Sequence, residues 1–243
     1  MKALILAAGL GTRLRPLTDT MPKALVKVNG RPMLLNVIEK LIAAGYDDIV
    51  INVHHFADQI IEYVRANDSF GVKVRFSDES DLLRETGGGI RHAAPLLSGS
   101  DSPVLVHNVD IESNLDLKWF ASQHRSGDIA SLAVSNRATK RYLLFDDDMK
   151  LAGWTNVETG EVRSPFGKIN PKDYTPLAFS GIHQISPEIF PLMASWPEKF
   201  SIIDFYLSVC NTHTVRATVP PEFKLNDLGK IQGQIRYGRL SSK

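Results

Sequence analysis

The chain has 243 residues, of which 43% are hydrophobic and 23% are charged, a composition typical of a folded globular protein. Its 28 Lys and Arg residues nearly balance 27 Asp and Glu residues, so it lacks the positive field that would recruit a nucleic-acid polymer or an anionic membrane without specific contacts. The only cysteine, Cys210, excludes an intramolecular disulfide framework and a thiolate-rich metal site, and it favours a cytoplasmic location.

The N-terminal half alternates between expected strands and helices. An apolar run over 3–7 is too short for the core of a signal peptide and is typical of a buried parallel strand, because a glycine-rich turn follows it. Helices are then expected over 33–44, 57–66 and 88–97, and strands over 49–53, 72–76 and 104–107. This order predicts an α/β fold of the Rossmann-like kind, with a doubly wound, mostly parallel sheet.

Beyond about residue 128 the pattern changes to short strands, expected over 131–134, 142–145, 151–155 and 161–163. Ser186 and Pro187 suit the cap and first turn of a helix, a second apolar stripe covers 200–210, and a closing helix is expected over 230–237. No linker or repeat divides the chain, so residues 1–243 are expected to form a single domain. No apolar run approaches the roughly 18 residues that a membrane helix needs.

The turn after the first strand has the residues of a polyphosphate-binding loop. Gly9 and Gly11 let backbone N–H groups approach phosphate oxygens, while Arg13 can bind them bidentately and Lys23 adds a point charge. The turn lacks the third glycine of a dinucleotide fingerprint and the Gly-Lys-Ser/Thr of a P-loop. The alternative is a surface turn whose cations are solvated.

Two further segments have features of a ligand site. Glu85-Thr86 followed by three glycines could leave room for a planar base against the backbone, although such a turn is more often only a tight loop. Asp110 follows the apolar strand 104–107, at the edge of the sheet where open α/β folds bind ligands. It is the leading candidate for a metal ligand, and a helix cap is the alternative.

The segment from Gly9 to Lys23 resembles the signature of the nucleoside-diphosphate-sugar pyrophosphorylases, a family of sugar-1-phosphate nucleotidyltransferases. The Glu-Thr-Gly-Gly-Gly segment is most similar to the branch that includes N-acetylmuramate-1-phosphate uridylyltransferases and mannose-1-phosphate guanylyltransferases. The resemblance implies that Lys23 neutralises charge at the reacting α-phosphate. It also implies that the residues of two glycine-rich turns bind the nucleotide: Ala8, Gly9, Gly11, Thr12, Arg13, Glu85, Thr86 and Gly87.

The same resemblance implies that Asp110 and Asp227 share one Mg²⁺ ion and that Asn108, Ser180 and Gly181 contact the sugar. Val109 stands where the family usually has glycine, and the surroundings of Asp227 also depart from the family pattern. Residues 1–127 would form the nucleotide-binding half, and residues 128–243 a sugar-binding and closing half with antiparallel insertions.

The implied activity is Mg²⁺-dependent transfer of a nucleotidyl group from a nucleoside triphosphate to a sugar 1-phosphate, which gives a precursor for cell-wall or glycan synthesis. UTP with an N-acetylated hexose or muramic acid phosphate is expected first, while GTP with mannose phosphate and CTP with another sugar phosphate stay open. The expected state is a monomer or a homodimer. The absence of a hexapeptide repeat argues against an added acetyltransferase activity.

Two other functions remain possible from the sequence. One is a nucleotide-sugar-binding regulator without efficient chemistry, suggested by Val109 and the altered surroundings of Asp227. The other is a glycosyltransferase of a related fold, in which the three aspartates 146–148 would be the metal motif. A charged hairpin tip is the simpler interpretation of those aspartates.

Overall fold

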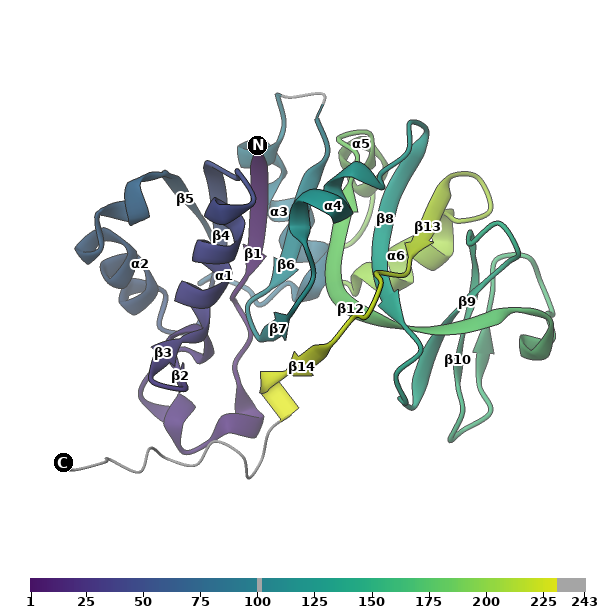
Figure 1. Cartoon of the computed structure of the whole chain (residues 1–243), viewed down its shortest axis with the longest axis horizontal. Helices are drawn as coiled ribbons and strands as arrows, with labels where there is room; N and C mark the ends of the chain where they lie inside the picture. Colours follow the sequence, from purple (N-terminus) through teal and green to yellow (C-terminus); the bar gives the residue numbers. More distant parts are fainter. Residues whose placement is uncertain (100–101, 231–243) are drawn as a thin grey trace.

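The structure, a computed structural model, describes residues 1–99 and 102–230, and its central feature is a ten-stranded sheet (Figure 1). Strands β6, β1, β4 and β5 lie side by side in that order and run parallel. They span Val104–Asn108, Lys2–Leu6, Asp48–Val53 and Lys73–Asp78 respectively. The alternating pattern of the N-terminal half therefore predicted this part of the sheet, and the doubly wound α/β fold is confirmed.

Helices cover both faces of the sheet. Ala3 and Ile5 of β1 face one apolar cluster, whereas Leu4 faces the other, because successive side chains of a strand point to opposite faces. The first cluster receives the apolar faces of α1 (Met33–Ala43), α2 (Ala57–Ala66) and α4 (Leu117–Ser122). The second receives those of α3 (Glu85–Leu97), α5 (Ile189–Met193) and α6 (Ile202–Val209).

Strand β12 (Thr175–Ile185) joins the parallel strands to an antiparallel region, which lies on the side of the molecule away from α1 and α2 (Figure 1). It pairs with β6 and β8 (Asp128–Ser135), and its first residues pair with β9 (Arg141–Phe145). The sheet continues through β10 (Leu151–Asn156) and β11 (Val162–Arg163), while β13 (Thr214–Thr218) pairs parallel with β8. The antiparallel insertions expected after residue 128 are therefore present.

Two short ribbons lie outside the main sheet: β2 (Lys27–Val28) with β3 (Arg31–Pro32), and β7 (Ile111–Ser113) with β14 (Leu225–Asp227). Among the described residues, 3₁₀ turns span Thr12–Leu14, Leu17–Asp19, Lys23–Leu25, Asp68–Gly71, Pro171–Asp173 and Leu228–Lys230. The second ribbon brings the C-terminal strand back to the residues that follow β6.

Some expected boundaries are wrong. The helix predicted to open at Ser186 and Pro187 begins at Ile189, with Glu188 at its N-cap and no side-chain cap. The glycine-rich turn belongs to α3 itself, which begins at Glu85 rather than at Gly88. The helix expected over 230–237 lies outside the described residues apart from Lys230. Within residues 1–99 and 102–230, no helix is long and apolar enough to cross a membrane.

Candidate active site

The candidate site, here called the central pocket, lies where β1 and β6 end and α3 begins, and has a volume of about 250 Å³. Seven of the residues proposed from the sequence line it together: Ala8, Gly9, Lys23, Glu85, Thr86, Asn108 and Asp110. Its other lining residues are Leu6, Asn52, Leu83 and Val109. Because the carboxyl ends of parallel strands meet at this edge, residues far apart in the sequence share one pocket.

The first glycine-rich turn folds around Lys23. Gly11 has a φ of 64°, and a Cβ atom there would lie 2.8 Å from the Thr18 side chain and 2.9 Å from that of Lys23. Only glycine allows this close approach without strain. At Gly9, in contrast, a Cβ atom would meet nothing within 4 Å, so the backbone is open toward the pocket.

Thr12 and Arg13 lie on the 3₁₀ turn after Gly11 and are exposed. Neither residue lines the central pocket, and the same holds for Gly11, Gly87, Ser180, Gly181 and Asp227. The structure thus places the Arg13 guanidinium outside the pocket that holds Lys23. A role for Arg13 with an extended triphosphate remains a proposal.

The two candidate metal ligands meet through the ribbon of β7 and β14. Asp227 stands opposite Ile111, and the N–H of Leu228 donates to the carbonyl of Asp110 at 2.8 Å. A Cβ atom on Gly229 would lie 2.6 Å from Asp110 Oδ2 and 3.2 Å from Asp227 Oδ1. That position is therefore bordered by both carboxylates.

Lys23 reaches the same point. Its ammonium donates to Asp110 Oδ2, and a Cβ atom on Gly229 would lie 3.0 Å from Lys23 Nζ. The side chains of Lys23 and Asp110 are 13% and 14% exposed, so the pair is shielded from bulk water. In the described part of the chain, no group of three or more His, Cys, Asp and Glu side chains is placed to hold a metal. Two carboxylates that leave the remaining positions to phosphate and water fit the oxygen preference of Mg²⁺.

The second glycine-rich turn is held by the segment 198–202. Gly87 and Gly88 donate their N–H groups to the carbonyl of Phe200 at 2.9 and 3.2 Å, and Thr86 Oγ1 accepts from the N–H of Ile202 at 3.0 Å. A Cβ atom on Gly87 would overlap the Phe200 ring. On the side where a Cβ atom would point, the space beside Gly87 is filled by protein, so Gly87 has a packing role, and nucleotide binding by its backbone stays a prediction.

Of the residues predicted to contact the sugar, Asn108 lines the central pocket and Gly181 packs against it. Gly181 has a φ of 80°, and a Cβ atom there would lie 2.6 Å from the Asn108 side-chain amide nitrogen. The close approach of β12 to Asn108 therefore requires glycine at this position. Ser180 is buried, and its hydroxyl accepts from the N–H of Ile182 at 3.2 Å, so its side chain bonds within its own strand.

Asn52 is a pocket residue that the sequence reasoning missed. Its Oδ1 accepts from the N–H of Ala8 at 3.1 Å, and its amide nitrogen donates to Glu79. Glu79 is fully buried, and burial raises the pKa of its carboxyl above the ordinary value. A polar residue within the apolar run 49–53 was the available signal.

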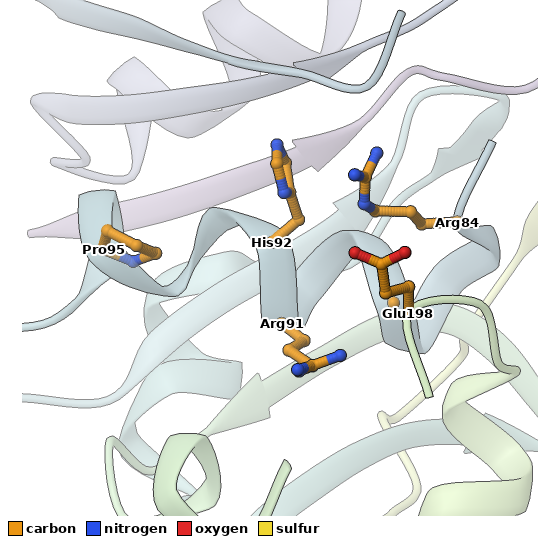
Figure 2. Close-up of a pocket in the computed structure, with 6 residues that line it drawn as sticks. Arg84, Arg91, His92, Pro95 and Glu198 are labelled. Atoms are coloured by element: carbon orange, nitrogen blue, oxygen red, sulfur yellow. The ribbon is translucent and has the colours of Figure 1, made fainter. Parts of the chain in front are cut away.

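Another pocket, here called the α3 pocket, lies on the outer side of α3 and has a volume of about 230 Å³. Figure 2 shows Arg84 and Glu198 close together at one end of it and Pro95 at the other. Arg84 is held by Asp81 through two hydrogen bonds of 2.7 Å. Of the glycines proposed to leave room for a base, Gly88 lines this pocket, but none of the residues that line the central pocket does, so the two pockets are separate.

The three aspartates 146–148 form the turn between β9 and β10. Asp146 Oδ1 accepts from the N–H groups of Asp148 and Lys150 at 3.0 and 2.8 Å, which is the geometry of a hairpin tip. This agrees with the simpler interpretation of these residues.

Comparisons with known proteins agree with this architecture. Residues 2–142 match the family described as nucleotidyl transferase. The chain is 37% identical over 193 residues to N-acetylmuramate alpha-1-phosphate uridylyltransferase of Caulobacter vibrioides, an alignment that covers 77% of this chain and 76% of the relative. It is 42% identical over 137 residues to mannose-1-phosphate guanyltransferase of Aspergillus oryzae, which covers 56% of this chain but only 37% of that enzyme.

A solved structure is similar over nearly the whole chain. HddC from Yersinia pseudotuberculosis, crystallised in complex with GMP-PN, superposes with a TM-score of 0.72 at 25% sequence identity. The superposition covers 94% of this chain and 93% of HddC.

Proposed function

Because this chain belongs to the nucleotidyl transferase family and is a sugar-phosphate nucleotidyltransferase, we propose that it joins UTP to a sugar 1-phosphate in a Mg²⁺-dependent reaction and releases pyrophosphate. The convergence of Asp110, Asp227 and Lys23 beside Gly229 carries this proposal. It supplies the Asp110 carboxylate and the Lys23 ammonium at the wall of a pocket bounded by a glycine-rich turn, with the Asp227 carboxylate beside them. In this proposal residues 1–243 act as one domain in the cytoplasm, as a monomer or a homodimer.

The reaction needs no nucleophile from the protein. An oxygen of the sugar phosphate attacks the α-phosphorus of the triphosphate, the bond from that phosphorus to the bridging oxygen breaks, and pyrophosphate leaves. The residues of the chain therefore contribute by positioning the two substrates and by stabilising the charge that develops in the transition state.

Lys23 has the central role in this scheme. Its ammonium lies on the wall of the central pocket and is shielded from water, so its attraction for phosphate oxygens is stronger than at an exposed position. The backbone N–H of Gly9, in the open part of the turn, would donate to an oxygen of the triphosphate. Arg13, on the exposed turn after Gly11, is proposed to hold the departing pyrophosphate.

Asp110 and Asp227 would hold the Mg²⁺ ion. When bound, the ion would neutralise phosphate charge and orient the reacting oxygens. The carboxylates themselves are positioned by the ribbon of β7 and β14 and by the hydrogen bond from Leu228 to Asp110. Asp227 is the last residue of β14 and Asp110 lies in the short turn between β6 and β7, so main-chain hydrogen bonds fix the positions of both carboxylates.

The choice of substrates follows a relative whose alignment covers 77% of this chain. UTP and an N-acetylated hexose or muramic acid phosphate are proposed first, because the Caulobacter vibrioides relative is a uridylyltransferase for N-acetylmuramate 1-phosphate. The fungal relatives are guanyltransferases for mannose 1-phosphate, so GTP with that sugar is the second combination to test.

Pyrophosphate release tests the proposal. The protein would be mixed with Mg²⁺, each common nucleoside triphosphate, and the 1-phosphates of N-acetylmuramate, N-acetylglucosamine, glucose and mannose. We expect release with UTP and loss of release when EDTA removes the metal. A folded protein that binds a nucleotide sugar but releases no pyrophosphate with any pair would instead be a nucleotide-sugar-binding regulator or a glycosyltransferase.

A further inference from the structure

Two buried polar side chains, Asn52 on β4 and Glu79 directly after β5, are hydrogen-bonded to each other beside the central pocket. Asn52 is 2% exposed and lines the pocket, whereas Glu79 is 0% exposed and does not. Within residues 1–99 and 102–230, the Glu79 carboxylate makes no ion pair. A carboxylate that is buried without a cation is costly, so the bonds that it makes need an explanation.

Asn52 holds the main chain of the first glycine-rich turn. Its carbonyl accepts from the N–H of Ala7 at 3.2 Å, and its side-chain Oδ1 accepts from the N–H of Ala8 at 3.1 Å. The next residue, Gly9, forms the open part of the turn. Asn52 therefore fixes the two residues directly before Gly9, on whose position the proposed triphosphate contact depends.

Glu79 holds the second glycine-rich turn. Its Oε2 accepts from the N–H of Arg84 at 3.2 Å, and Arg84 precedes Glu85 and Thr86, which line the central pocket. Its Oε1 accepts from the side-chain amide of Asn52. The carboxylate of Glu79 therefore joins the two turns that border the pocket.

The third glycine of the Glu-Thr-Gly-Gly-Gly segment makes room for this pair. A Cβ atom on Gly89 would lie 2.9 Å from Glu79 Oε1 and 3.2 Å from Asn52 Nδ2. Any larger residue would push these two groups apart. Helix α3 therefore packs directly against the hydrogen bond between the two side chains because residue 89 is glycine.

The donors and acceptors of this network fit together in only one direction. The N–H groups of Ala8 and Arg84 can only donate, so Asn52 presents its oxygen to Ala8 and its amide nitrogen to Glu79. Glu79 must then accept one hydrogen bond at each oxygen. A carboxylate can do so, whereas the amide of glutamine would turn a donor toward another donor.

We propose that Glu79 is a positioning residue for the nucleoside triphosphate, because its carboxylate, bonded to Asn52 and to the N–H of Arg84, holds the two glycine-rich turns at the spacing that the nucleotide requires. The inference rests on the proposed function, since it takes the central pocket as the nucleotide site. Glu79 does not line this pocket. Its loss should therefore weaken nucleotide binding and leave kcat nearly unchanged.

The variant Glu79→Gln separates positioning from charge. Removal of a negative charge near the site would by itself strengthen the binding of an anionic triphosphate. Because a buried donor loses its acceptor, we expect instead that the Kd for UTP rises about tenfold. Calorimetry with Mg²⁺ and without sugar phosphate measures this Kd. In steady-state kinetics KM for UTP should rise similarly, while kcat stays within about threefold.

An exchange of the two groups tests the direction of the network. Asn52→Asp alone places two buried carboxylates against each other, so it should also weaken UTP binding. In the double variant of Asn52→Asp and Glu79→Gln, the carboxylate at position 52 accepts from Ala8 and from the amide at position 79, whose oxygen accepts from Arg84. All three hydrogen bonds and the total charge are restored, so the Kd for UTP should return to within about threefold of the wild type.

A matched control removes a buried carboxylate elsewhere. Asp128 is 3% exposed and accepts from Arg216 of β13, and it does not line the central pocket. Asp128→Asn should lower the free energy of unfolding but leave the Kd for UTP unchanged. Gly89→Ala keeps every charge and donor but displaces the pair, so it should weaken UTP binding even if Glu79→Gln fails to fold.

Binding without turnover distinguishes this inference from the proposed function. Weaker UTP binding in the single variants, with recovery in the double variant, supports the inference even if no pyrophosphate is released. Unchanged affinity in the single variants, or no recovery in the double variant, would overturn it and leave the transferase activity intact. Variants that lose stability but keep the Kd for UTP would overturn it as well, because the pair would then act on the core alone.

GTP is the second probe. If the wild type binds GTP rather than UTP, the same changes in Kd are expected for GTP. A folded wild type that bound neither triphosphate would overturn both the inference and the proposed function.

Discussion

Thr86 Oγ1 accepts a 3.0 Å hydrogen bond from the backbone N–H of Ile202, and this bond joins the turn at the central pocket to the first turn of α6. Thr86 lines the central pocket, whereas Ser201, which caps α6, lines a separate pocket together with Arg137, Arg141 and Arg163. This bond between a side chain and the main chain therefore connects the walls of the two pockets.

Replacing Thr86 by valine keeps the shape of the side chain but removes the acceptor. Leaving the Ile202 N–H without a partner should cost on the order of 1–3 kcal/mol of stability. It should also raise KM for both the triphosphate and the sugar phosphate, measured by pyrophosphate release. Thr86→Ser, which keeps the hydroxyl, should behave almost as the wild type. A rise confined to the triphosphate KM would show that Thr86 acts on one substrate alone.

Replacing Lys23 by alanine should lower kcat by about 10²–10³, the range typical for losing one electrostatic contact to the transition state. The reason is the position of the ammonium, which lies at the wall of the central pocket and is shielded from solvent. Steady-state kinetics with saturating substrates measures the effect. Lys27→Ala, at an exposed lysine of β2, provides the control and should keep normal turnover. A near-normal kcat for Lys23→Ala would remove this residue from the mechanism.

Replacing Asp110 or Asp227 by asparagine should lower activity by about 10²-fold or more, because each carboxylate is proposed to hold the Mg²⁺ ion. A second readout is the rise in Tm that Mg²⁺ and UTP together produce in the wild type, which either variant should lose. Asp147→Asn, on the exposed tip of the β9–β10 turn, should retain both activity and the Tm shift. A full Tm shift in Asp227→Asn would show that Asp227 is not a ligand.

The parts of the site that the sequence predicted lie at the ends of continuous apolar strands. Asp110 follows β6, and the turn through Gly9 follows β1, so the topology of a parallel sheet brings them together without further information. Pairing these with Asp227 required a resemblance to a family, because the β7–β14 ribbon is set by contacts between residues far apart in the chain.

The packing role of Gly87 could not be predicted, because the residue that fills the space beside it, Phe200, belongs to the other half of the chain. Asn52 was missed for a different reason, since its neighbours gave a strong strand pattern that hid its side-chain bonds to Ala8 and Glu79. The spacing of residues in the sequence also could not predict the pocket lined by Arg137, Arg141 and Arg163. Its walls come from β9, β10, β11, β12, α6 and the segment before β9, which only the complete fold brings together.

Lys40 of α1 holds the end of β7 in the β7–β14 ribbon, and the pH dependence of stability tests this role. Its ammonium reaches from α1 to Ser113 at the end of β7, donating to the carbonyl at 2.7 Å and to the hydroxyl at 2.9 Å. Burial is the main cause that lowers the pKa of Lys40 from 10.5 to about 8, although Asp116 and Glu112 act in the opposite direction. Above the lowered pKa the folded chain therefore releases a proton that the unfolded chain still holds.

The unfolded state consequently binds more protons than the folded state between pH 8 and 10.5, so this group makes the free energy of unfolding rise with pH across that window. Urea unfolding at several pH values measures the free energy of unfolding of the wild type and of Lys40→Met. As pH rises from 8, this free energy should increase in the wild type relative to Lys40→Met. Lys118→Met, at an exposed position of α4, should differ from the wild type in free energy of unfolding by the same amount at each pH. If the free energy of unfolding of the wild type relative to Lys40→Met did not change across the same window, the Lys40 ammonium would keep its ordinary pKa. Its bonds to Ser113 would then hold β7 without a cost from burial.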